Sequence, residues 1–97
     1  MYVDARHPVV LLAETDDLTR FSVVADSHEA LAERAGQFGR LADGVAFVRC
    51  DWIRGSGPGT PEWPTALEAM FAFAESSGWL TDGHVQAHIV GPDPGPA

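Results

Sequence analysis

The sequence Val45-Ala46-Phe47-Val48-Arg49-Cys50-Asp51-Trp52-Ile53-Arg54, followed by the glycine-rich run Gly55-Ser56-Gly57-Pro58-Gly59-Thr60, decides the expected fold. Its first part has the alternation of a strand, in which neighbouring residues point to opposite faces. One face would carry Ala46, Val48, Cys50 and Trp52, and the other Val45, Phe47, Arg49, Asp51 and Ile53. Glycine and proline predict a loop after this strand, and Pro61 suits the first turn of a helix.

The segments behind the loop predict one more helix and one more strand. The helix, with Thr60 as its expected cap, begins at Pro61 or Pro64 and ends at Ser76-Ser77-Gly78. Its apolar residues recur at helical spacing at Trp63, Leu67, Met70, Phe71 and Ala74. A turn over 81–83 leads to a strand over 84–90. That strand would place Val85, Ala87 and Ile89 on one side, and His84, Gln86 and His88 on the other.

The segments before the central strand predict two strands and a helix, and residues 1–7 are left without an assigned state. The continuous apolar run 9–13 is typical of a strand buried on both sides. A second strand is predicted over 20–25, and the short connection favours an antiparallel hairpin between the two. Asp26 is the expected N-cap, with Glu29 completing a capping box, of a helix over 27–42 that ends at Asp43-Gly44.

This element order predicts a two-layer α/β (α+β-like) sandwich. The order is β-β-α-β-α-β, with a mixed sheet of about four strands and both helices on one face, since strand–helix–strand units make right-handed crossovers. Residues 1–90 would form a single domain. Residues 91–97, rich in proline and glycine, would form a disordered tail.

Composition and charge narrow the classes of partner. The 97 residues include 14 acidic and 6 basic ones, all of the latter arginine, for a formal charge of −8. This charge disfavours binding to nucleic acid or to an anionic membrane surface, and suits a basic protein partner, although solubility alone also explains it. No apolar run approaches the ~20 residues of a membrane span, and no leader pattern opens the chain. The single cysteine fits a reducing interior, so a cytoplasmic location is expected.

The sheet face away from the helices is the first candidate for a functional surface. It would be half apolar and half polar, with Arg20, Ser22, Val24, Phe47, Arg49, Asp51, His84, Gln86 and His88. Such a face either packs against a second subunit or lines a ligand cavity. We therefore expect a homodimer, with Phe47 at the interface.

His84 and His88 are the sharpest chemical pair in the sequence. Their spacing places both on one side of a strand, where Asp51 could join them as acid and base. A metal site is not predicted, because no third ligand has a definite position and no zinc-binding motif occurs. No cofactor is expected. Arg49 and Asp51, two residues apart, could form an ion pair that holds an edge or a dimer contact.

The glycine-rich run resembles a phosphate-binding loop only in its glycines. Such loops end in Gly-Lys-Ser or Gly-Lys-Thr, and this chain has no lysine. A hinge or lid is the favoured interpretation. Trp52 and Trp63 flank the run and could hold an apolar ligand or a partner's side chain, but packing in a small core is the slightly favoured interpretation. Cys50 is expected to point inward, as a small buried hydrophobe.

Two functions remain open at this level. The first is a small acidic protein-binding module without enzymatic activity, of the immunity-protein, antitoxin or accessory type, whose partner contacts include Arg49, Asp51, Trp52, Trp63 and Phe47. In outline the chain is similar to barstar-like ribonuclease inhibitors: acidic, α/β, short and tryptophan-containing. No motif carries that similarity, and membership is not claimed. The alternative is a small dimeric, cofactor-free enzyme or ligand carrier that uses His84, His88, Asp51 and Arg49.

Overall fold

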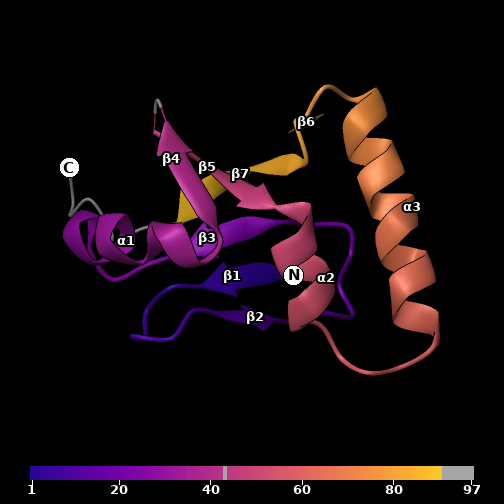
Figure 1. Cartoon of the computed structure of the whole chain (residues 1–97), viewed down its shortest axis with the longest axis horizontal. Coiled ribbons are helices and arrows are strands. Elements are labelled where there is room, and N and C mark those ends of the chain that lie inside the picture. Colours follow the sequence, from indigo (N-terminus) through magenta and orange to yellow (C-terminus); the bar gives the residue numbers. More distant parts are fainter. Residues whose placement is uncertain (43, 91–97) are drawn as a thin grey trace.

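Seven strands and three α-helices make up residues 1–42 and 44–90, the part of the chain that the computed structural model describes (Figure 1). In chain order the elements are β1 (Tyr2–Asp4), β2 (Leu11–Ala13), β3 (Ser22–Val24), α1 (His28–Arg34), η1 (a 3₁₀ turn, Ala35–Gln37), β4 (Gly39–Ala42), β5 (Val45–Arg49), α2 (Cys50–Ser56), α3 (Glu62–Ser76), β6 (Leu80–Thr81) and β7 (His84–Val90). The chain is thus an α+β domain.

The strands form one open, mixed sheet in the order β2-β1-β3-β7-β5-β4, with β6 paired to part of β7. β3 lies parallel to both β1 and β7, and all the other pairs are antiparallel. The predicted mixed sheet is confirmed. The described residues have more strands than the expected four, and three α-helices where two were expected.

The two faces of the sheet follow the predicted alternation within β5 and β7. Cross-strand partners point to the same side, and the register pairs Val23 with Ile89, Ala46 with Ala87, and Val48 with Val85. These residues belong to the hydrophobic core, together with buried side chains of all three helices: Leu31 of α1, Cys50 and Ile53 of α2, and Trp63, Leu67 and Phe71 of α3. Figure 1 shows α1 and α3 toward opposite ends of the molecule, with α2 between them.

The prediction for the first strands is wrong in its pairing. β1, which the sequence left unassigned, lies between β2 and β3, so these two strands do not form a hairpin. β2 is an edge strand and is not buried on both sides, because Leu11 is 54% exposed and the preceding Val9 is 67% exposed. A three-residue strand such as β1 is too short to display an alternating pattern, which is why the sequence did not reveal it.

The predicted helix over 27–42 is wrong in its second half. Helical hydrogen bonding ends in the 3₁₀ turn at Gln37, and Gly39 begins β4. Gly39 lies so close to β5 that an added Cβ would collide with the carbonyl oxygen of Phe47, so this strand pair needs a glycine there. The N-cap is Ser27, not Asp26: its hydroxyl accepts a hydrogen bond from the amide of Ala30 at 3.0 Å. Gly44 belongs to the β4–β5 connection, and Asp43 lies outside the described residues.

The central strand is shorter than predicted. β5 ends at Arg49, and the next residues form α2. Cys50 and Ile53 are buried at a spacing of three, which is a helical period that a strand pattern hides over so short a stretch. The strand predicted over residues 50–53 is therefore wrong, and so is the outward face predicted for Ile53, whereas Cys50 is buried as expected.

The last helix and the last strand match the sequence prediction closely, whereas the short β6 between them was not predicted. α3 runs from Glu62 to Ser76, and β7 covers the predicted range 84–90 after a turn at Asp82 and Gly83. The predicted tail over 91–97 lies outside the described residues. Within the described ranges, no helix has both the length and the apolar character needed to cross a membrane.

Candidate functional site

His84 and His88 lie on the same side of β7, as predicted, but they do not form a compact pair. They are four positions apart in the strand, which corresponds to about 13 Å along it. His84 pairs in register with Arg49, and its Nδ1 lies 2.9 Å from the carbonyl oxygen of Asp82. His88 pairs with Ser22 on one side and Val45 on the other. The two imidazoles therefore lie in different parts of the sheet and do not face one common site.

Asp51 is not brought to these histidines. It lies in α2, where its carboxylate is largely exposed and accepts a hydrogen bond from Arg54 at 2.8 Å. Arg49, at the end of β5, donates to the carbonyl oxygen of Gln37 at 2.8 Å. The expected Arg49–Asp51 ion pair does not form, because the chain turns from strand to helix between the two residues. Across residues 1–42 and 44–90, no three His, Cys, Asp or Glu side chains are grouped closely enough to hold a metal ion.

The aromatic residues singled out from the sequence make contacts with other residues of the same chain. Trp63 is buried, and its indole N–H donates to the carbonyl oxygen of Thr15 at 2.7 Å. The ring of Trp52 packs against that of Phe38, with 6.1 Å between centroids. The Phe47 ring lies under the guanidinium of Arg40, 4.3 Å from its centroid. These contacts give all three residues a structural role.

Cys50 is buried at the start of α2. Burial raises the pKa of its thiol, because the apolar surroundings disfavour the thiolate. This environment is that of a small core residue and not of a nucleophile, in line with the inward orientation expected from the sequence.

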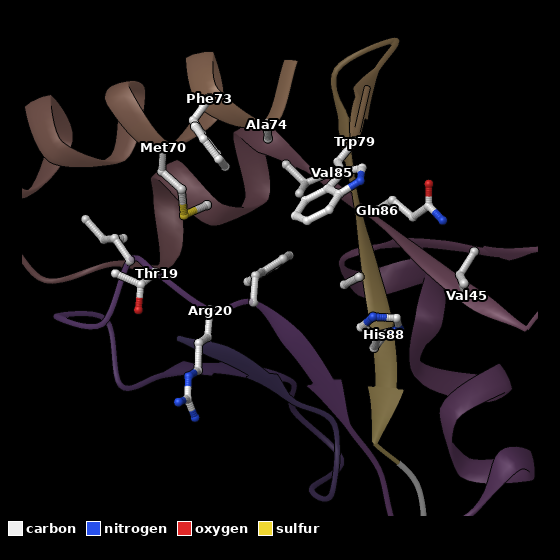
Figure 2. A pocket seen from close by; sticks show the side chains of 13 residues that line it. Thr19, Arg20, Val45, Met70, Phe73, Ala74, Trp79, Val85, Gln86 and His88 are labelled. Atoms are coloured by element: carbon white, nitrogen blue, oxygen red, sulfur yellow. The ribbon is translucent and has the colours of Figure 1, made fainter. Parts of the chain in front are cut away.

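The fold forms a cavity of about 280 Å³ between α3, the β2–β3 connection and β7 (Figure 2). Most of its wall is apolar. Its lining residues are Leu18, Thr19, Arg20 and Phe21 from the connection; Met70, Phe73 and Ala74 from α3; Trp79 before β6; Val85, Gln86, Ala87 and His88 from β7; and Val45 from β5.

The cavity arises where one edge of β7 changes partners. β6 pairs with His84 and Val85, and the amide of Gln86 still donates to the carbonyl oxygen of Trp79 at 2.8 Å. β3 pairs with the same edge from His88 onward. The short β6 and the late start of β3 leave a gap beside Ala87, and α3 spans it. Residues of both faces of β7 line the cavity for this reason.

Two large apolar side chains lie exposed at the mouth of this cavity. Phe73 is 66% exposed and Trp79 is 58% exposed. Figure 2 shows Met70 and Phe73 reaching from α3 toward the cavity, with the indole of Trp79 facing them from across it. Exposed aromatic groups around a concave apolar surface mark interaction sites more often than isolated surface residues do.

The polar lining residues lie at the rim. In Figure 2 the guanidinium of Arg20 and the amide of Gln86 both point away from the space between Met70 and Trp79. His88 is exposed on the same side of the sheet as Gln86, because the two residues are two positions apart in the strand. The cavity thus combines an apolar interior with polar groups at its edge, which is the usual division within a protein interface.

The cavity overlaps little with the site residues expected from the sequence. Of the residues that the sequence placed on the face opposite the helices, Arg20, Gln86 and His88 line it. Of the expected site residues, only His88 does so: the lining does not include Arg49, Asp51, Phe47, His84, Trp52 or Trp63. The sequence did not single out Phe73 or Trp79. The available signal was that Phe73 lies beside the main apolar stripe of α3, and that Trp79 stands alone between two turn-forming segments.

Comparison with known proteins identifies no relative: no protein-family model, no curated protein and no solved structure matches this chain.

Proposed function

We propose that this protein is a small acidic protein-binding module without enzymatic activity, of the immunity-protein, antitoxin or accessory type, and that it binds a more basic protein. One observation carries the proposal: Phe73 and Trp79 lie exposed at the mouth of an apolar cavity in a chain of net charge −8. An apolar side chain of the partner would enter the cavity and cover both aromatic rings.

The energetics of interfaces support this use of the cavity. A few aromatic and arginine residues around a water-excluding pocket supply most of the binding free energy in typical complexes. Phe73, Trp79 and Arg20 are residues of these types at one opening. Burying one large apolar side chain of the partner contributes roughly 1.5–3 kcal/mol before the costs of association.

The charge around the cavity supports a basic partner. Asp16 and Asp17 directly precede the lining residue Leu18, and Glu75 directly follows Ala74. Carboxylates on these segments would attract a positively charged surface and raise the rate of encounter at low ionic strength. A cytoplasmic location stays part of this proposal.

An enzyme or ligand carrier built on His84, His88 and Asp51 has less support. General acid–base chemistry needs its groups within hydrogen-bonding reach of one reacting centre. Asp51 is engaged by Arg54 on α2, and the two histidines are separated along β7. The geometry therefore favours binding over catalysis at these residues.

Homodimerisation through the open sheet face stays a prediction. Phe47, the residue expected at its centre, is covered by Arg40 of its own chain. A partner subunit would have to displace that guanidinium or pack on top of it. Sedimentation of the wild type and of a Phe47→Asp variant tests this prediction separately from the cavity.

Affinity capture with matched variants tests the proposed function. A Phe73→Ser/Trp79→Ser variant removes the exposed rings at the cavity mouth. A Val9→Ser/Leu11→Ser variant removes a comparable exposed apolar pair near β2 and serves as the control. We expect the wild type and the control to retain the same basic protein from an extract, the cavity-mouth variant to lose it, and high salt to weaken the capture.

Two results would contradict the proposal. One is a captured protein that survives the loss of Phe73 and Trp79. The other is a loss of capture that is equal for both double variants. Circular dichroism of each variant confirms that it is folded before the comparison is made.

A further inference from the structure

Arg20 stands apart from the other five arginines of the chain. Arg6 and Arg54 form ion pairs, with Asp4 in the first case and with Asp51 and Glu68 in the second. Three others are engaged through a carbonyl oxygen or a ring: Arg34 with Ala5, Arg49 with Gln37, and Arg40 with Phe47. Within residues 1–42 and 44–90, the Arg20 guanidinium makes no hydrogen bond, ion pair within 4.0 Å or ring contact. Its charge only adds to the hydrogen bonds from Thr19 that lower the pKa of the neighbouring Asp17 carboxyl.

This guanidinium, without a hydrogen-bonded or ion-paired partner among the described residues, lies at the rim of the cavity. Arg20 precedes Ser22 by two residues, and Ser22 pairs with His88, so extended chain would direct Arg20 to the side of the sheet that carries His88. Figure 2 shows its side chain at the edge of the cavity and Met70 reaching inward from α3. If a partner's apolar side chain filled the cavity, the Arg20 guanidinium would lie beside the partner's neighbouring residues at the cavity opening.

We infer that the partner's docking segment carries a carboxylate next to its apolar anchor, and that Arg20 pairs with this carboxylate while the anchor fills the cavity. This inference rests on the proposed function and specifies the chemistry of the partner. A planar guanidinium can donate two parallel hydrogen bonds to a carboxylate, which fixes the orientation of the segment as well as attracting it.

The surrounding acidic residues narrow the choice of anion. Asp16, Asp17 and Glu75 lie on the segments that line the cavity, and the whole chain carries a charge of −8. A single carboxylate opposite Arg20 is compatible with these surroundings. A dianionic phosphate would be repelled more strongly, and so would a long acidic segment. The segment is therefore expected to be basic around one acidic residue.

Three capped peptides test the inference by calorimetry at low ionic strength. The first is acetyl-Arg-Gly-Phe-Glu-Gly-Arg-amide, the second has Gln in place of Glu, and the third has Ala in place of Phe. We expect the first to bind the wild type roughly two- to fivefold more tightly than the second, the range of an exposed ion pair. The third should bind about tenfold more weakly than the first, because it leaves the cavity unfilled.

Two variants with the same change in charge locate the carboxylate. Arg20→Gln should bring the ratio of the Glu and Gln peptides close to one. Arg40→Gln should leave that ratio unchanged, because Arg40 lies on β4, two strands away from β7. Both arginines are exposed, so neither substitution is expected to prevent folding.

The outcomes separate this inference from the proposed function. Equal affinity for the Glu and Gln peptides, or a Glu preference that persists in Arg20→Gln, overturns the role of Arg20 but leaves protein binding at the cavity intact. Failure of all three peptides to bind overturns both. Sedimentation shows whether the wild type self-associates and whether the peptides only compete with that self-association. If they do, a second copy of the chain is the occupant of the cavity, and the inference is overturned.

Discussion

The two ends of α3 use similar residues in opposite ways. At the closed end, defined here by Trp63, Gly57, Arg54 and Glu68, the indole is buried against a glycine and hydrogen-bonded, and the arginine is ion-paired. At the open end, defined by Phe73, Trp79 and Arg20, the aromatic rings are exposed around a cavity and the arginine is unengaged within the described residues.

This difference makes the open end of α3 the candidate for a functional surface. Single aromatic residues and arginines are common on protein surfaces and need no explanation. Several of them around one concave surface indicate a binding site. The sequence drew attention to the glycine-rich run and its tryptophans. In the fold, Trp63 is buried in the core, whereas Phe73 and Trp79 at the open end stay exposed.

The largest contrast is expected between the two tryptophans. Trp63→Ala should lower the free energy of unfolding by about 3–5 kcal/mol, because it empties a buried site and leaves the carbonyl of Thr15 unpaired. Trp79→Ala should lower it by less than about 1 kcal/mol, because the side chain is mostly exposed. Urea unfolding followed by circular dichroism measures both.

If Trp63→Ala does not fold, Trp63→Phe provides the same comparison with a smaller loss in the free energy of unfolding. Similar losses of stability at positions 63 and 79 would break the distinction between the closed and the open end.

A smaller effect is expected from the glycine-rich run. A Cβ at Gly57 would collide with the six-membered ring of Trp63, whereas one at Gly59 would meet no atom within 4 Å. The backbone of Gly57 has φ −85° and ψ 179°, which any residue adopts, so only the ring opposes a side chain there. Gly57→Ala should therefore cost about 1–3 kcal/mol and Gly59→Ala should stay within about 0.5 kcal/mol.

Equal tolerance of alanine at the two positions would show that the run is a mobile connection, as the sequence suggested, and not part of a packed closed end. Thermal unfolding of the two variants side by side distinguishes these cases.

The smallest effect concerns the ion pair of the closed end and its dependence on pH. Hydrogen bonds from Arg54 lower the pKa of the Glu68 carboxyl below its ordinary value of 4.5. Because the folded pKa is the lower one, the pair stabilises the fold above pH 4.5, and this contribution is lost as the pH falls through the lowered value. Both side chains are about half exposed, so Glu68→Gln should cost at most ~1 kcal/mol at neutral pH.

The difference in stability between the wild type and Glu68→Gln should disappear in acid below both pKa values. Glu75→Gln is the control, since Glu75 is exposed on the same helix and forms no ion pair with the described residues. A Glu68→Gln effect that stays constant with pH would contradict the assigned pair.

The fold could be predicted from the sequence where elements are long and periodic. The stripe of α3 and the alternation of β7 identified both elements, and the faces of β5 followed from the same alternation. The prediction failed where elements are short. β1 and β2 have three residues each, and the change from β5 to α2 occurs inside one apolar stretch, where both periods fit the same residues.

The candidate site could be predicted only in part, because it depends on pairing between distant segments. Local pattern placed Arg20, Gln86 and His88 on one face of the sheet. The gap beside Ala87 follows from where β6 ends and β3 begins along β7, which no local pattern contains. Asp51 was assigned to a strand face for a local reason: it belongs to α2, in a stretch where the strand and helix periods both fit.

The central claim is that the open end of α3 is the binding surface, and chemical-shift mapping tests it most directly. In a titration of the ¹⁵N-labelled protein with the peptide that contains Phe and Glu, the amide shifts should concentrate at Arg20, Met70, Trp79 and residues 86–88. The amides of Gly57, Trp63 and Glu68 should change little. Shifts centred on the closed end, or spread evenly over the chain, would contradict the claim.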